Sequence, residues 1–160
     1  MGLDMYLYKR KKESRENEID VVAYWRKANQ VHNWFVTNVQ NGVDNCEPHP
    51  VTERDIIKLL NICNQILELD INYEEQMTEI GVSFKDGKRE PIMDFVKVID
   101  NEEVIETMHN LLPTADGFFF GSTDYDEWYV EDIKDTAEQL NHVLEEIDFK
   151  TEELFYNSSW

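Results

Sequence analysis

The spacing of apolar residues changes along the first quarter of the chain, and each change predicts an element. Leu3, Met5 and Leu7 alternate with Asp4 and aromatic residues, which is the period-two pattern of a strand with one buried face. A strand is therefore predicted over residues 2–9. From about residue 21 to residue 40 the apolar positions recur every three or four residues, and this spacing predicts a helix.

The middle of the chain carries three further signals. Thr52 precedes a three-four apolar repeat that runs to about Leu69, so it is the expected N-cap of a second helix. Asp86-Gly87 is a dipeptide that tolerates the positive φ values of a tight turn, which predicts a hairpin around it. Asn101 begins another helical repeat, and Pro113 is expected to end it.

The last third predicts a strand, a long helix and a final strand. The run GFFFG at residues 117–121 is apolar and too short for a helix, so a buried strand is expected. A helical repeat follows from about Tyr125 to Ile147, and the chain ends on the aromatic stretch LFYNSSW, a strand that could pair with the first. The candidate N-caps of the long helix are Ser122, Thr123 and Asp124.

These elements predict an α+β domain with about four helices packed on a small, mainly antiparallel sheet. A chain of 160 residues with 41% hydrophobic content has the size of one core, and no linker or repeat interrupts it. We therefore expect a single domain over residues 1–160. The N-terminus lacks a secretory pattern and no apolar run is long enough for a membrane span, so a cytoplasmic protein without membrane contact is predicted.

The charge is strongly negative and unevenly placed. The net charge is −19, and residues 100–160 hold 17 acids and two bases. Such a surface repels phosphate backbones, so direct nucleic-acid binding is not expected. Lys9, Arg10, Lys11, Lys12 and Arg15 form a basic exception, for which a solvated strand end is the commoner explanation.

The helix predicted over residues 21–40 carries an uncharged polar strip beside its apolar side. The 16 residues from Ala28 to Val43 contain no Asp, Glu, Lys or Arg in a chain that is 31% charged. Amides can bind the polar edges of a ligand, an indole can stack on it, and a guanidinium can pair with its anionic group. The alternative is that these groups secure neighbouring loops. The candidate ligand-binding residues of this strip are Trp25, Arg26, Asn29, Gln30, His32 and Asn33.

The turn before the long helix is a second candidate for ligand binding. Ser122 and Thr123 follow a glycine at an expected helix start, where free backbone N–H groups and hydroxyls can bind an anion. Helix capping alone also explains both residues, and the neighbouring carboxylates would repel an anion. If this turn lies beside Arg26 and His32, the two halves form one pocket.

A row of acids on the long helix is the third candidate. Carboxylates at helical spacing can imitate a phosphate backbone and occupy a host protein, although a solvated acidic face is the commoner explanation. The acidic partner face predicted for this alternative, a decoy that acts through residues 124–146, comprises Glu131, Asp135 and Glu138.

Catalytic and metal-binding patterns are missing from the sequence. The four histidines and two cysteines lack the spacing of a zinc site, and no nucleophile with its base can be identified. We therefore predict no metal and no cofactor and favour binding over catalysis, with a small hydrolase as the third hypothesis.

Several blocks of the chain resemble a family of small phage and prophage proteins. The blocks are MGLDMYLY, YWRKANQVHNWFVTNVQNGVDNC, LLPTADGFFFGSTDYDEWY and the terminal FYNSSW, and the resemblance covers most of the chain outside residues 70–100. It implies a phage genome expressed in a bacterial cytoplasm, and it implies no catalytic residue.

The leading hypothesis from the sequence is a phage-type intracellular binding protein. Its partner would be a small polar or nucleotide-like ligand, or a short segment of a host protein, and capture of a host signalling nucleotide would give it a counter-defence role. The sequence leaves a homodimer open.

Overall fold

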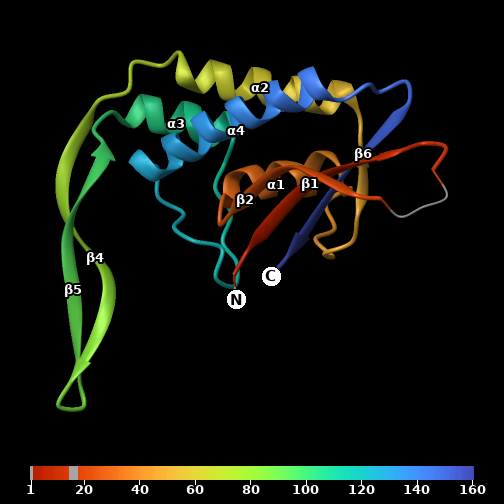
Figure 1. Cartoon of the computed structure of the whole chain (residues 1–160). Helices are drawn as coiled ribbons and strands as arrows, with labels where there is room; N and C mark the ends of the chain where they lie inside the picture. The colour runs from red at the N-terminus through yellow and green to blue at the C-terminus, as the bar shows by residue number, and fades with distance from the viewer. Residues whose placement is uncertain (1, 15–17) are drawn as a thin grey trace.

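A four-stranded sheet joins the two ends of the chain (Figure 1). The computed structural model describes residues 2–14 and 18–160, so Arg15 of the basic cluster lies outside the described residues. In spatial order the strands are β2 (Asp20–Arg26), β1 (Asp4–Lys11), β6 (Glu152–Ser159) and β3 (His49–Val51). Each neighbouring pair is antiparallel, and the predicted pairing of the first and last strands is confirmed.

Helices complete the α+β fold that the sequence predicts. The four helices of the described residues are α1 (Asn29–Asn38), α2 (Glu53–Leu67), α3 (Glu102–Leu111) and α4 (Glu127–Glu146). α2 and α4 lie side by side in Figure 1, and they make extensive contact with each other. In the part of the chain that the structure describes, no helix is both long enough and apolar enough to cross a membrane.

The core lies between the helices and one face of the four-stranded sheet. Met5 and Leu7 of β1 and Leu154 and Tyr156 of β6 are buried, which follows from the alternation of side chains along a strand. Phe35 of α1 stacks on Tyr156 with ring centroids 4.0 Å apart. The buried apolar side chains of the described residues form a single cluster, to which both the sheet and the helices contribute.

Two of the three predicted helix N-caps are confirmed. Thr52 and Asp55 form a capping box at the start of α2, and the Asn101 side chain accepts backbone N–H bonds at the start of α3. The expectation that Ser122, Thr123 or Asp124 caps the long helix is wrong. Asp126 caps α4, because its carboxylate accepts the N–H groups of residues 128 and 129 at 3.0 and 3.1 Å.

The predicted helix over residues 21–40 is half wrong, because residues 20–26 form strand β2. Ala23 and Trp25 are buried while Tyr24 and Arg26 are exposed, which is the period-two pattern of a strand. β2 pairs with β1, and Lys27, with a φ of 58°, separates the strand from α1. Pairing with β1 stabilises these residues as a strand, although the same apolar residues also satisfy the spacing of a helix.

The strand predicted at 117–121 is also wrong, because this segment is a turn. Phe119 and Gly121 have φ values of 56° and 91°, which lie outside the range of a regular strand. Phe120 is buried, whereas Phe118 and Phe119 are exposed. A Cβ on Gly117 would lie 2.4 Å from the Phe120 ring, so the fold of the turn requires glycine there.

The predicted hairpin is confirmed and is longer than the sequence suggested. β4 (Tyr73–Lys85) and β5 (Lys88–Ile99) form a two-stranded antiparallel ribbon, joined at Asp86 and Gly87 with φ values of 51° and 74°. Positive φ at both central residues is the geometry of a type I′ turn. The ribbon extends away from the rest of the chain (Figure 1).

Candidate functional site

A pocket opens where β2 passes into α1. Its volume is about 340 Å³, and one wall is the loop of residues 113–126, which connects α3 to α4. Arg26 ends β2 and Lys27 follows it, so two adjacent cations line this pocket. The other lining residues are Gln30, Thr114, Gly121, Ser122, Asp124, Asp126, Trp128, Tyr129 and Asp132.

Close backbone contact positions Lys27 against this loop. The Lys27 N–H donates to the Leu3 carbonyl at 2.8 Å, which holds the connection between strand and helix. A Cβ on Gly121 would lie 3.2 Å from both the Cβ and the carbonyl oxygen of Lys27. The positive φ of Gly121 also disfavours any side chain at this position. Glycine therefore allows the loop to approach the start of α1.

The side chain of Asn29 ties the same loop to α1. Its Nδ2 donates to the carbonyl oxygens of Phe120 at 3.2 Å and Ser122 at 2.8 Å, and its Oδ1 accepts from the Ala115 N–H at 3.0 Å. Asn29 is 2% exposed, so these bonds are shielded from water. One buried amide thus satisfies three backbone groups of a loop that has no regular structure.

The pocket combines cations without partners and a group of carboxylates. The side chains of Arg26 and Lys27 form no hydrogen bond or ion pair with any residue of the described ranges. The carboxylates among the lining residues belong to Asp124, Asp126 and Asp132. The pocket can therefore receive a ligand that has both an anionic group and a hydrogen-bond-donating edge.

Burial raises the pKa of two of these carboxylates. It raises the pKa of Asp132 to about 6, and the hydrogen bond from the Gln30 side chain opposes this shift in part. Burial also raises the pKa of Asp126, against the two N–H bonds that the carboxylate accepts as N-cap. Desolvation disfavours the charged form because the carboxylate loses hydrating water. Shifted carboxyl groups in a cleft are a feature of functional sites.

Asp132→Asn is expected to change how stability depends on pH. The folded state binds the Asp132 proton more tightly than the unfolded chain, so the acid favours folding below its ordinary pKa of 3.8 and loses this contribution as the pH rises to about 6. The stability of the variant relative to the wild type should therefore rise between about pH 4 and pH 6 and then level off. Urea unfolding across this pH range measures it.

The exposed acid Glu138 on the same helix provides the control for this measurement. Glu138→Gln also removes one negative charge from α4, but outside the pocket. A relative stability of Asp132→Asn that stays constant across the pH range, or one that Glu138→Gln reproduces, would contradict the effect of burial.

Of the predicted ligand-binding residues, the structure brings Arg26, Gln30 and Ser122 together in this pocket. The Ser122 hydroxyl accepts the Asp124 N–H at 3.1 Å. The Gln30 amide nitrogen lies 3.4 Å from the Tyr129 carbonyl and 3.3 Å from the Asp132 carboxylate, so Gln30 orients Asp132. The sequence left open whether the turn at residues 117–124 lies beside Arg26 and His32; Arg26 and Ser122 line one pocket, and His32 does not line it.

The prediction that Trp25, Asn29 and His32 contact a ligand is wrong, because these residues are buried. Their exposed fractions are 3%, 2% and 1%. The Trp25 indole N–H donates to the Thr136 hydroxyl at 3.0 Å. The two ring nitrogens of His32 lie 2.6 Å from the Tyr156 hydroxyl and 2.8 Å from the Asp44 carboxylate. The protein's own groups thus occupy their hydrogen-bonding atoms, and the alternative explanation, that they secure neighbouring segments, applies to them.

The last two predicted ligand-binding residues lie outside the pocket. Asn33 is half-buried and borders a separate hollow of about 230 Å³ beside Trp34 and Thr37. Thr123 is exposed, and its carbonyl oxygen accepts the Thr114 hydroxyl at 2.9 Å. Asn33 belongs to α1, which begins after the turn at Lys27, whereas Thr123 belongs to the loop between α3 and α4.

Four charged residues of the pocket, Lys27, Asp124, Asp126 and Asp132, were not predicted from the sequence as ligand-binding groups. Lys27 adjoins Arg26 and so carried a signal in the sequence, whereas Asp124 was considered as a helix cap, and both Asp124 and Asp126 as groups that would repel an anion. Asp132 had no signal, since its place in the pocket depends on how α4 packs against α1. In the described ranges no three His, Cys, Asp or Glu side chains are grouped so that they could hold a metal ion.

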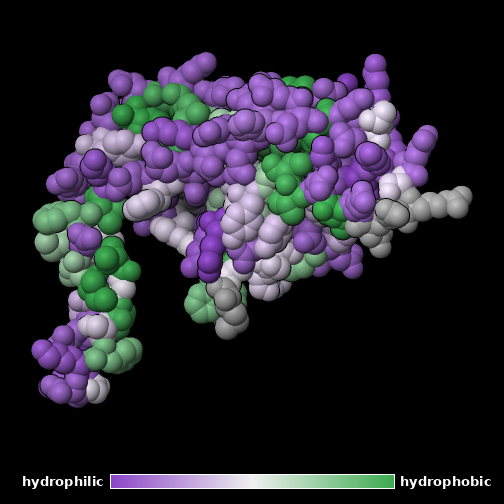
Figure 2. Space-filling model, in the orientation of Figure 1, coloured by the Kyte–Doolittle hydropathy of each residue, from purple (hydrophilic) through white to green (hydrophobic). Residues whose placement is uncertain are grey.

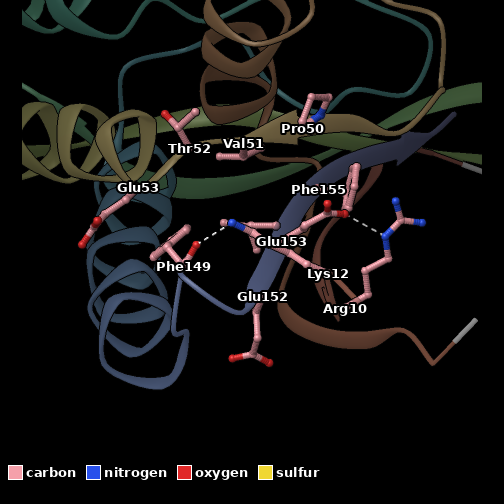
Figure 3. A pocket seen from close by; sticks show the side chains of 11 residues that line it. Arg10, Lys12, Pro50, Val51, Thr52, Glu53, Phe149, Glu152, Glu153 and Phe155 are labelled. Atoms are coloured by element: carbon pink, nitrogen blue, oxygen red, sulfur yellow. Dashed lines mark hydrogen bonds and ion pairs between the residues drawn. The ribbon is translucent and has the colours of Figure 1, made fainter. Parts of the chain in front are cut away.

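A larger cavity of about 500 Å³ lies at the other end of the sheet (Figure 3). Its cations already have partners: Arg10 pairs with Glu153 at 3.0 Å and lies over the Phe155 ring, and Lys12 donates to the Phe149 carbonyl at 2.9 Å. A ligand would have to compete with these contacts. We therefore place the candidate site in the smaller pocket, where the cations have no partners.

The predicted acidic face of α4 is exposed along its length. Glu131 pairs with Lys134 at 3.0 Å, and Asp135 accepts a bond from Gln139 at 2.8 Å. Glu138 is also exposed. These three carboxylates are therefore accessible to a partner, as a decoy of a host protein would require. The decoy function stays a prediction.

Comparison of the chain with protein-family models, with curated proteins and with solved structures gives no match. The resemblance to small phage and prophage proteins therefore stays a prediction based on its quoted blocks. The fold and the site together define an α+β domain with a surface pocket that is lined by both cations and carboxylates.

Proposed function

We propose that this chain is a binding protein for a small polar ligand that carries an anionic group and an amino or amide edge, as a nucleotide does. The observation that supports this proposal is the pair of unpartnered cations, Arg26 and Lys27, in one pocket with Asp124, Asp126 and Asp132. A volume of about 340 Å³ lies at the lower end of the range for small-molecule sites, so a ligand no larger than a mononucleotide is favoured.

Each wall of the pocket has a distinct role in this proposal. Arg26 can bind a phosphate through two parallel N–H bonds, and Lys27 adds a second positive charge beside it. Asp124 accepts from the amino edge of a base. The indole of Trp128 is 63% exposed at the rim, where a planar ring can stack on it.

Binding without catalysis is the form of the proposal that we favour. The lining residues include Ser122 and Thr114, but within the described ranges neither hydroxyl forms a hydrogen bond with a histidine or a lysine that could act as its base. The resemblance to phage proteins suggests that the captured ligand is a host signalling nucleotide and that the role is counter-defence.

Thermal-shift and calorimetric titration with a panel of mono- and cyclic nucleotides tests this proposal. A nucleotide that binds should raise the melting temperature, because ligand binding to the folded state stabilises it. Arg26→Ala should weaken that binding by about 10- to 100-fold, the effect of one lost charge-assisted contact. Lys27→Met, which keeps the aliphatic stem, should have a similar effect of smaller size.

Arg54→Ala is the matched control, since Arg54 is an exposed arginine on α2 and does not line the pocket. It should leave the affinity unchanged. The proposal fails if none of the nucleotides raises the melting temperature, or if the Arg26→Ala and Arg54→Ala variants bind equally well.

A further inference from the structure

The β4–β5 ribbon exposes a continuous apolar face. Residues directly opposite each other in an antiparallel pair point to the same side, and Met77 lies opposite Phe95 while Val82 and Phe84 follow further along β4. Phe84 is 76% exposed and Phe95 is 60% exposed. We call this the outer face, and its apolar members are Met77, Val82, Phe84, Met93 and Phe95.

The opposite face of the ribbon turns toward the rest of the molecule. Val96 and Val98 line a hollow together with Asp126 and Trp128 at the start of α4, and Val98 forms a β-bridge with Asp126. Figure 2 shows apolar side chains, in green, along the ribbon, whereas its tip and most of the helical surface in this view are hydrophilic. The body thus covers the base of this face, at Val96 and Val98, and leaves the outer face without any contact from the described residues of the body.

Such a ribbon needs a partner in order to be stable. A two-stranded hairpin without a third strand or a covering element is marginally stable in water. Each strand has 12 or 13 residues, so the ribbon is about 40 Å long. Exposed apolar patches on a long projection are typical of protein interaction sites.

We propose that the outer face packs against the outer face of a second copy of this chain and forms a two-fold symmetric dimer. The two ribbons lie face to face, with the aromatic rings of one against the methionines of the other. A two-fold interface joins identical surfaces, so one apolar patch on each copy is sufficient. This inference does not depend on the proposed function, because the ligand pocket lies on the body.

The charge distribution favours a second copy over a charged macromolecule. Residues 73–99 hold six acids and four bases, a net charge of −2, so the remainder of the chain carries −17. Two such bodies repel each other, and a long, nearly neutral ribbon lets them associate at a distance from the acidic surfaces. The charges between the apolar side chains are paired within the ribbon, since Arg89 contacts Glu79 at 2.6 Å.

The apolar area of the outer face meets the requirement of a specific interface. A large apolar side chain that is about half exposed offers roughly 100 Å², so five of them offer about 500 Å² per copy. Two copies bury about 1,000 Å² through these residues alone, which is the lower limit for a specific interface. Pro91 and the stems of Glu79 and Arg89 lie on the same face and add to this area.

Analytical ultracentrifugation of the full chain at micromolar concentration tests the proposal. The wild type is expected to sediment as a dimer. Phe95→Asp places a carboxylate in the middle of the interface and should raise the dimer dissociation constant at least 100-fold. Because Phe95 is exposed in the monomer, the helical circular dichroism of the variant should match that of the wild type.

Ile92→Asp is the matched control, because Ile92 is exposed on the opposite face of the same strand. It introduces the same charge and should leave the dimer intact. A wild type that is monomeric, a Phe95→Asp variant that stays dimeric, or an Ile92→Asp variant that dissociates to the same degree would each overturn the proposal.

Discussion

Phe35→Ala is expected to lower the free energy of unfolding by about 3–5 kcal/mol, the usual cost of removing a buried aromatic ring. Phe35 is fully buried and stacks on Tyr156 with centroids 4.0 Å apart. It also contacts Trp34 and Trp25, at 5.2 and 6.2 Å between centroids. The ring therefore joins α1 to two strands of the sheet, and its loss leaves a cavity between rigid aromatic neighbours that cannot close it.

Urea unfolding, followed by circular dichroism and by tryptophan fluorescence, measures this cost. Phe118→Ala is the control, because it removes the same ring from a side chain that is 63% exposed, and it should change stability by less than about 0.5 kcal/mol. A loss of less than 1 kcal/mol in Phe35→Ala, or equal losses in the two variants, would show that Phe35 does not hold α1 on the sheet.

Asn29→Ala is expected to lower the free energy of unfolding by about 2–4 kcal/mol. It leaves the Ala115 N–H and the carbonyl oxygens of Phe120 and Ser122 without their buried partner. Each buried backbone group that loses its bond costs about 1–3 kcal/mol, less where water can enter. Because Ser122 lines the pocket, the same variant should also bind a ligand more weakly.

Denaturant unfolding measures the global effect, and hydrogen exchange at the Ala115 amide measures the local one. Asn33→Ala is the matched control: Asn33 lies on the same helix, is half-buried, and has no hydrogen-bonded partner for its side chain in the described ranges. It should cost less than about 1 kcal/mol. If Asn29→Ala proves no more costly than Asn33→Ala, or if the Ala115 amide stays equally protected, then Asn29 does not hold the loop.

Local signals in the sequence predicted α2, α3 and the hairpin turn correctly. Thr52 and Asn101 begin helices because their side chains accept N–H groups two or three residues away. Asp86-Gly87 turns the chain because both residues adopt positive φ. All of these interactions lie within a few residues, so the sequence alone contains the necessary information.

The segment from 20 to 40 shows where local reasoning fails. Tyr24, Ala28, Val31 and Phe35 satisfy a helical spacing, yet residues 20–26 gain more by pairing with β1 through the register of Met5 and Trp25. A choice between two periods that the same residues satisfy depends on whether a partner strand is available, and that partner lies elsewhere in the chain.

By itself the sequence determined the α+β class, the caps of α2 and α3, the hairpin and the acidic surface, because periodicity, short-range capping and charge count require no knowledge of distant contacts. The tertiary structure alone decided which polar groups are buried. Asn29 receives its partners from residues 86 to 93 positions away, and Asp132 reaches the pocket because α4 packs beside α1. Burial is a property of the packed chain. Whether an amide is structural or free to bind a ligand therefore depends on the loop of residues 113–126, which packs on Asn29.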